Sequence, residues 1–230
     1  AAMKADGFGW WIRRVEGAAR LFDAIRLDHF RAFASYWAVP AGAKTAREGA
    51  WEQGPGMDLL GVLTSWFPQI TYIAEDLGIL TEDVHRLRKD SGLPGMKVLE
   101  FAFSGPDNAY LPHQYPDSRC ICYTGTHDND TAAGWYASAT PQEKAYARKY
   151  LGVERDDAQT VCRALLRAGQ GSIAELFVAQ MQDYLGLGSE ARVNVPGVPR
   201  GNWSWRMEPG KTTDALADAI RDLTHTFGRC

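Results

Sequence analysis

The chain has 230 residues, of which 45% are hydrophobic and 23% charged, and its formal net charge is -3 at pH 7. This is the composition of a globular protein whose core is large enough to fold without disulfides or metals. The small negative charge and the scattered basic residues exclude nucleic acid as an expected partner. A membrane is not expected either, because the longest uncharged stretch, 59–74, is too short to cross a bilayer.

Apolar periodicity predicts the elements of the first part of the chain. They are, in order, a helix over 10–22, a strand over 24–29, a helix over 59–67 and a strand over 70–74. Both strands are short apolar runs that end in charged residues, as buried parallel strands do. The Gly- and Pro-rich stretch 40–56 is expected to be a loop that becomes ordered only with substrate or a partner.

The second part continues the alternation of helices and strands. The predicted elements are a helix from Thr81 to about Lys89, strands over 96–103 and 121–126, helices opened by capping boxes at Thr140–Glu143 and Ser172–Glu175, a strand over 191–195 and a helix over 213–227. Such alternation indicates parallel βα units, which form either an open sheet or a (β/α)8 barrel. Both folds place their chemistry at the carboxyl ends of the strands.

The four cysteines do not have the spacing of a zinc site. They are Cys120, Cys122, Cys162 and Cys230. Reduced structural thiols are the favoured interpretation, with disulfides as the alternative, and reduced thiols suit a reducing cytoplasm. No metal is expected, and no signal peptide is expected from the first residues.

Acidic motifs follow the first two predicted strands. A period of two places Arg26 and Asp28 on one face of a strand, and the guanidinium favours an ionised Asp28, the form that a glycosyl-forming nucleophile needs. Glu75 and Asp76 follow the strand 70–74, and a partly desolvated carboxyl there would have a raised pKa and could act as a general acid. The alternatives are a structural ion pair at the sheet rim and a charge at a helix N-terminus.

Two polar loops complete the set of candidate residues. The stretch 124–131 is polar throughout, and its Asp128 could bridge two hydroxyls of a sugar; a loop held by Asx-turns is the alternative. His127 by itself is more commonly a structural histidine. In the stretch 194–206, tryptophan faces could stack on sugar rings while asparagines bind hydroxyls, or the indoles could simply fill a gap in the core.

The order Arg-x-Asp, Glu, His-Asp resembles the α-amylase clan, and the motifs themselves resemble glycoside hydrolase family 77, the amylomaltases. The matching stretches are Arg26-Leu27-Asp28-His29-Phe30-Arg31, Ala74-Glu75-Asp76-Leu77-Gly78, 96–103, 124–131, 194–206 and the loop with Gly54-Pro55-Gly56. The resemblance covers nearly the whole chain. It implies that residues 1–230 are the C-terminal part of a catalytic (β/α)8 barrel, roughly its second half, with a substrate loop at about 37–58. The N-terminal half of the same enzyme is then an expected partner.

The resemblance also implies an activity, that of a 4-α-glucanotransferase. Such an enzyme moves segments of α-1,4-glucans and maltooligosaccharides to glucose or another glucan by a retaining double displacement. Asp28 would be the nucleophile, Glu75 the general acid/base and Asp128 the transition-state stabiliser. The remaining substrate-binding residues would be Arg26, His29, His127, Asn129, Asn194 and Trp203.

No metal or cofactor is implied by the resemblance. The expected location is the cytoplasm, or the plastid if the source is a plant. Two alternatives stay open, namely an α-glucan hydrolase of the same clan and an inactive glucan-binding fragment. The ratio of reducing ends to transfer products distinguishes the hydrolase, and retained binding without turnover distinguishes the fragment.

Overall fold

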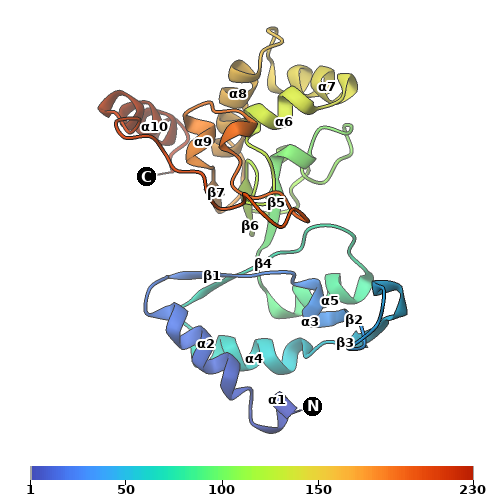
Figure 1. Ribbon diagram of the computed structural model, residues 1–230. Coiled ribbons are helices and arrows are strands. Elements are labelled where there is room, and N and C mark those ends of the chain that lie inside the picture. Colours follow the sequence, from blue (N-terminus) through green and yellow to red (C-terminus); the bar gives the residue numbers. More distant parts are fainter. Residues whose placement is uncertain (1, 230) are drawn as a thin grey trace. The chain divides into compact units, whose positions relative to one another are not determined.

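The computed structural model describes residues 2–229, and the chain divides into two compact units with the boundary between Met96 and Lys97. In the first unit, strands β1 (Ala24–Leu27) and β4 (Thr71–Ala74) pair in parallel, with Leu27 beside Ala74. Its helices are α1 (Ala2–Ala5), α2 (Gly9–Ala19), α3 (Arg31–Ala34), α4 (Gly56–Trp66) and α5 (Glu82–Ser91). Helix α4 packs against α2 and α5, as Figure 1 shows.

The core of the first unit is built on α4. Its Leu59, Leu60 and Leu63 recur at helical spacing and are almost fully buried. They belong to one apolar cluster with Phe30, which directly precedes α3, and Tyr72, which lies in β4. Burial of this stripe fixes the helix against the two strands, and the helix ends at Trp66, before Pro68, as predicted.

The Gly- and Pro-rich stretch is more regular than expected. Strands β2 (Ser35–Ala38) and β3 (Ala50–Gln53) form an antiparallel hairpin, with Trp37 opposite Trp51 and 5.4 Å between their ring centroids. The 3-10 turn η1 (Ala46–Glu48) lies between the strands and is held by a capping box of Thr45 and Glu48. The expectation that only substrate or a partner orders this loop is therefore wrong, because a cross-strand aromatic pair and a cap already hold it.

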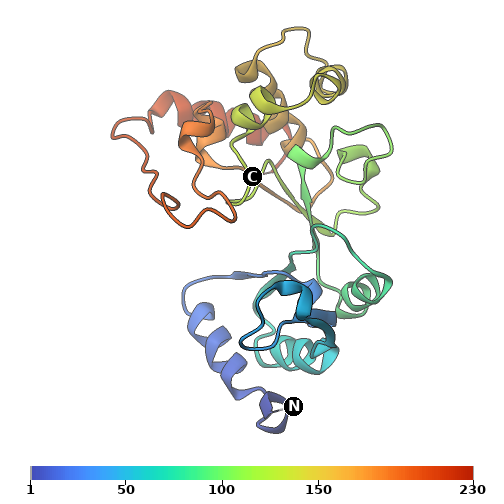
Figure 2. The same cartoon turned by 45° about the vertical axis from the view of Figure 1, so that its right-hand side comes forward.

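Strand β5 (Gly95–Val98) contains the boundary between the units and begins a three-stranded sheet in the order β5, β6 (Cys120–Tyr123), β7 (Leu176–Val178), with β6 and β7 parallel. The helices of the second unit are α6 (Ala132–Ser138), α7 (Pro141–Leu151), α8 (Ala158–Gln170), α9 (Met181–Tyr184) and α10 (Asp214–Thr226). Its 3-10 turns are η2 (Leu99–Phe101), η3 (Pro112–Gln114) and η4 (Ser189–Ala191). Helix α8 packs against α6, α7, α9 and α10, which are the yellow-to-red helices of Figure 2.

Four of the five predicted strands are confirmed as β1, β4, β5 and β6, but two predicted elements are wrong. The box at Ser172 opens no helix; residues 176–178 pair with β6 as β7 instead, and only the short α9 follows. The predicted strand 191–195 is the end of η4 and an irregular loop. The strand predicted over 96–103 ends at Val98 and turns into η2. Helices α6 and α8 were not predicted.

Cys122 and Cys162 are buried free thiols and Cys120 is buried as well, while Cys230 lies outside the described residues. Burial raises the pKa of the Cys122 thiol to about 11 and that of Cys162 to about 12. Both thiols therefore stay protonated at neutral pH, as packed structural cysteines do. Within residues 2–229, no helix is both long enough and apolar enough to span a bilayer.

Candidate active site

Asp28 and Glu75 follow two paired strands. The register of β1 and β4 places Leu27 beside Ala74, so the residues that follow them leave the sheet at the same edge. Two backbone hydrogen bonds extend this pairing, from Glu75 N to Leu27 O and from Phe30 N to Glu75 O, each 3.0 Å long. The carboxyl ends of both strands thus present one acidic residue each, where α/β enzymes carry their chemistry.

Arg26 forms an ion pair with Asp28. Its NH2 atom lies 2.8 Å from Asp28 Oδ1, and the side chain of Arg26 is 25% exposed while that of Asp28 is 77% exposed. The same guanidinium contacts Met96 Sδ through NH1 at 4.0 Å. The cation is therefore anchored within the first unit, and it holds a carboxylate that is open to an incoming ligand.

Glu75 is half-buried and is held by two backbone amides. His29 N donates to Oε2 at 2.7 Å and Leu77 N donates to Oε1 at 3.0 Å. Burial raises the pKa of Glu75; the two amides and the Arg26 cation lower it in part, and the Asp28 charge raises it. The net direction is upward, so Glu75 keeps its proton to a higher pH than an ordinary glutamate, as a general acid must.

His29 has a left-handed backbone, with φ of 45°. This conformation is unfavourable for a residue with a side chain and is found where surrounding contacts impose it, commonly at functional sites. Here it turns the amide of His29 toward Glu75. The backbone next to Asp28 thereby positions the carboxyl of Glu75.

Asp76, the neighbour of Glu75, has a structural role. Its Oδ1 accepts from Met96 N at 2.7 Å, and its Oδ2 lies 3.2 Å from Arg88 Nε. A Cβ at Gly95 would collide with this carboxylate, so glycine is required there. Of the two adjacent acids, Glu75 is therefore the one left for chemistry.

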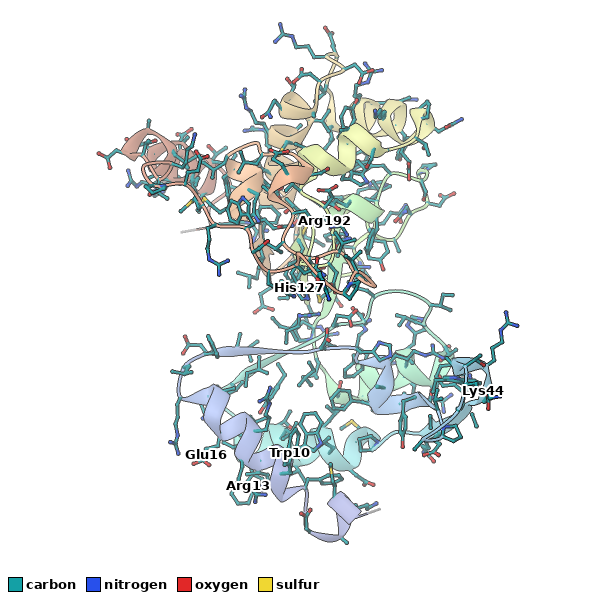
Figure 3. The ribbon with its side chains drawn as sticks, in the orientation of Figure 1. Trp10, Arg13, Glu16, Lys44, His127 and Arg192 are labelled. Carbon is teal, nitrogen blue, oxygen red and sulfur yellow. The ribbon has the colours of Figure 1, made fainter. Side chains whose placement is uncertain are left out.

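In the second unit, Asp128 lies in the loop after β6 and is held by three residues. Asn194 Nδ2 donates to Oδ1 at 2.6 Å, and His127 Nε2 lies 3.4 Å from Oδ2. Arg192 NH2 donates to the carbonyl of Asp128 at 2.6 Å. Figure 3 shows His127 and Arg192 in this unit. The structure thus brings together His127, Asp128 and Asn194, three of the predicted site residues.

Trp203 and Asn129 differ in what they do locally. The Trp203 ring packs against that of His127 with 5.3 Å between centroids, and its φ of 61° is left-handed. Asn129 Oδ1 accepts from both the amide and the hydroxyl of Thr126 at 2.9 Å. Its side-chain oxygen is therefore used to close the loop as in an Asx-turn, whereas Trp203 adds an aromatic face beside His127.

Sequence reasoning missed two residues that brace the Asp128 loop. Arg192 also donates through Nε to Asn194 O at 2.8 Å, and Gln180 Nε2 donates to Thr126 O at 3.2 Å. Both reach the loop from positions more than fifty residues further along the chain, where no local pattern indicates a partner. The sequence around Arg192 offers only a nearby Glu190, which does not indicate the loop after β6 as its partner.

The first unit places two carboxyl groups with different surroundings after its paired strands. Within residues 2–229, no group of three or more His, Cys, Asp or Glu is placed to hold a metal ion. One carboxyl is paired with arginine and another has a raised pKa, each at the carboxyl end of a parallel strand. This combination is typical of α/β proteins that act on glycosidic bonds.

The sequence profile of glycoside hydrolase family 77, described as 4-alpha-glucanotransferase, matches residues 1–213. The chain belongs to this family. It is 50% identical to the 4-alpha-glucanotransferase of Thermus thermophilus over 99% of the chain and 46% of that protein. It is 46% identical to the chloroplastic/amyloplastic 4-alpha-glucanotransferase of Solanum tuberosum over 99% of the chain and 40% of that protein. The chain thus spans about half the length of the curated relatives it matches.

Solved structures show the same fold. The amylomaltase of Streptococcus agalactiae in complex with acarbose superposes with a TM-score of 0.91 and 32% identity, over 99% of this chain and 46% of that one. The amylomaltase of Corynebacterium glutamicum superposes with a TM-score of 0.70 at 18% identity, over 98% and 38% of the two chains. The chain has the mixed α/β fold of an amylomaltase, with part of its set of strands.

Proposed function

We propose that the complete protein is a 4-α-glucanotransferase that moves segments of 1,4-α-glucan to the 4-OH of glucose or another glucan. The observation that carries this proposal is the pair of acids that follow β1 and β4: an arginine-bound Asp28 and a half-buried Glu75 with a raised pKa. Residues 1–230 are then the C-terminal part of a (β/α)8 barrel, with the hairpin loop at about 37–58 beside its substrate.

In the proposed first step, Glu75 donates its proton to the glycosidic oxygen while the Asp28 carboxylate attacks the anomeric carbon. The bond to the leaving glucan breaks, the leaving glucan keeps the proton as its 4-OH, and a glycosyl-enzyme forms. Carboxyl groups in a retaining enzyme lie roughly 5–5.5 Å apart, which neighbouring strands of one sheet can provide.

In the second step, the Glu75 carboxylate takes the proton of the acceptor 4-OH, and the acceptor oxygen attacks the anomeric carbon. Asp28 leaves as a carboxylate and Glu75 is again protonated. Two inversions retain the α configuration. The raised pKa of Glu75 suits this exchange, because the group must be an acid in one step and a base in the next.

The remaining proposed residues bind the sugar. Asp128, held by Asn194 and His127, stabilises the developing charge and binds hydroxyls, and Trp203 offers an aromatic face for a ring. The amylomaltase of Streptococcus agalactiae was solved with acarbose bound. We propose maltooligosaccharides and α-1,4-glucans as substrates here, with glucose as an acceptor.

The first unit also presents an open apolar face. A hollow between α2 and β1 is lined mostly by apolar residues, with Arg13, Arg14, Arg26 and Asp28 as its charged residues. At its rim, Leu21 is 76% and Phe22 60% exposed. We propose that the remaining strands and helices of the same barrel cover this face, which makes them the physical partner of this region. A reducing compartment, the cytoplasm or the plastid in a plant, suits the buried free thiols of Cys122 and Cys162.

The test is incubation of the complete protein with maltotriose, with products followed by chromatography and Asp28→Asn as the inactive control. Glucose together with maltooligosaccharides longer than maltotriose, absent with Asp28→Asn, supports transfer. Glucose and maltose without longer products would instead identify a hydrolase. Binding of maltooligosaccharides without turnover by the complete protein would identify a glucan-binding protein and overturn the proposal.

A further inference from the structure

Glu100 is a buried acid for which the proposed mechanism has no use. It lies in η2, directly after β5, and is only 6% exposed. Its backbone amide donates to Thr124 O at 3.1 Å, which ties η2 to the end of β6. Its Oε1 atom is buried and makes no hydrogen bond to the residues that the structure describes.

The Glu100 carboxyl lies directly against the start of the loop that carries His127 and Asp128. A Cβ built on Gly125 would be 2.6 Å from Glu100 Oε1 and 3.1 Å from Asn129 Cβ. A side chain at position 125 would therefore displace the Glu100 carboxyl. The carboxyl of Glu100 packs against Gly125, the first residue of the segment 125–129. A change in the size or charge of residue 100 should therefore alter the position of this segment.

The groups around Glu100 disfavour a negative charge. The like charges of Asp183 on α9 and Asp130 in the loop before α6 act on it, and Arg192 is the cation nearby. Arg192 forms no ion pair with Glu100, because its guanidinium is bound to the carbonyls of Asp128 and Asn194. An ionised carboxylate buried without a partner is very costly.

Asp183 shows the contrast. It is 1% exposed, but its carboxylate accepts hydrogen bonds from the hydroxyl of Thr124 and, at 2.7 Å, from the amide of Ala132. Burial raises the pKa of Asp183 and these donors lower it in part, whereas no donor among the described residues reaches Oε1 of Glu100. Of the two buried acids, Glu100 is the one that should hold the proton.

We propose that Glu100 is a positioning residue that, as the neutral acid, holds the segment 125–129 and thereby sets His127 and Asp128. The direction of its pKa agrees, because burial first and then Asp183 and Asp130 raise it to about 9. Ionisation would place a second charge beside Asp183 and push the carboxyl against Gly125. The contacts of Asp128 with Asn194 and His127 would then be lost. This inference rests on the proposed function only where activity is the readout.

The first experiment measures whether the Glu100 carboxyl is protonated. Infrared difference spectra of the complete protein at neutral pH, wild type against Glu100→Gln, should show one protonated carboxyl band that the variant lacks. The band should disappear from the wild type only as the pH rises through about 9. The exposed Glu154→Gln is the matched control and should leave the band in place. A spectrum in which Glu100→Gln removes only a carboxylate band would overturn the proposal, whether or not the protein transfers glucans.

The second experiment tests whether Glu100 positions the segment 125–129, with kcat as the measured quantity. Glu100→Gln keeps size and neutrality, so kcat for transfer from maltotriose should stay within about threefold of wild type. Glu100→Asp withdraws the carboxyl from Gly125 and should lower kcat by about tenfold to a hundredfold, the scale of a small misplacement at a reacting centre. Circular dichroism confirms that each variant folds. Equal kcat for Glu100→Asp and wild type, or a Glu100→Gln variant as slow as Glu100→Asp, contradicts the proposal. Absence of transfer by the wild type counts against the proposed function and leaves the infrared test standing.

Discussion

A single cation acts on both acids of the first unit. Arg26 pairs with Asp28 at 2.8 Å, and its charge also lowers the pKa of Glu75 against the larger effect of burial. The two carboxyls are thereby given different tasks by their surroundings, one bound to a cation and one kept partly out of water. Two carboxyl groups with different surroundings can take different roles, one as the acid and the other as the nucleophile.

Replacement of Arg26 by methionine tests this double role. We expect Arg26→Met to lower kcat, because Asp28 loses its cation, and to move the alkaline limb of the pH–rate profile to higher pH. The sign follows from Glu75, since removal of a cation that lowers its pKa lets the acid form persist further. The measurement is kcat against pH with the complete protein. The exposed Arg20→Met should change neither quantity, and an alkaline limb that moves to lower pH would contradict the assignment of Glu75.

Asn194 offers a second test at the same scale. Its amide nitrogen lies 2.6 Å from Asp128 Oδ1, so Asn194→Asp would place like charges in contact, whereas Asn194→Ala only removes a donor. We expect kcat to fall in both variants and to fall further in Asn194→Asp. Steady-state kinetics on maltotriose measures the order. Equal losses, or a smaller loss for Asn194→Asp, would show that the contact does not act on the charge of Asp128.

At the scale of elements, two identical cap signatures have opposite outcomes. At Thr140 the side chain accepts from Glu143 N and the Glu143 carboxylate accepts from Thr140 N, so α7 begins as predicted. At Ser172 the amide of Glu175 instead donates to Ser118 O and Cys120 O, which continues the sheet toward β7. A capping-box sequence indicates a local preference for a helix start, and hydrogen bonds to distant segments decide whether the helix forms.

The Thr140 cap should be measurable in α7 alone. Thr140→Ala should reduce the local stability of the helix by about 1 kcal/mol, seen as faster amide hydrogen exchange in 141–151.

The hydrogen bonds from Thr140 lower the pKa of Glu143, so the contribution of this carboxylate to stability is present above its unfolded pKa and is lost as the pH falls through its folded pKa. At acid pH, the protection of the amides of 141–151 from hydrogen exchange in Glu143→Gln should therefore approach that of the wild type. A difference that grows on acidification would contradict the cap, and Glu154→Gln serves as the control.

For the whole molecule, the decisive feature is the open apolar face on α2 and β1. This face includes Leu21 and Phe22, two large apolar residues with most of their surface exposed. The chain spans 46% of the Thermus thermophilus relative, which leaves room for the strands and helices that we propose as its cover. An uncovered face of this kind promotes aggregation.

A double substitution tests the cover. In the chain of 230 residues alone, Leu21→Lys with Phe22→Lys should reduce aggregation, because it replaces exposed apolar surface by charge. In the complete protein the same change should lower stability and the proposed transfer activity, because those side chains would then be buried. Light scattering and thermal unfolding measure the two effects. Ile79→Lys, at a site that is 88% exposed in the first unit, is the control, and a complete protein unaffected by the double change would contradict the proposed cover.

By itself, the sequence determined the βα alternation, four of the strands and the acids at their ends, because these depend on local periodicity and on spacing along one strand. It also pointed to the family, through motifs that each lie within a few residues. Only the tertiary structure decided that Asp76 is structural while Glu75 is half-buried, that Arg192 and Asn194 hold Asp128, and that Glu100 lies beneath Gly125. Each of these depends on contacts between segments distant in sequence, and burial and hydrogen bonding of that kind have no local signature.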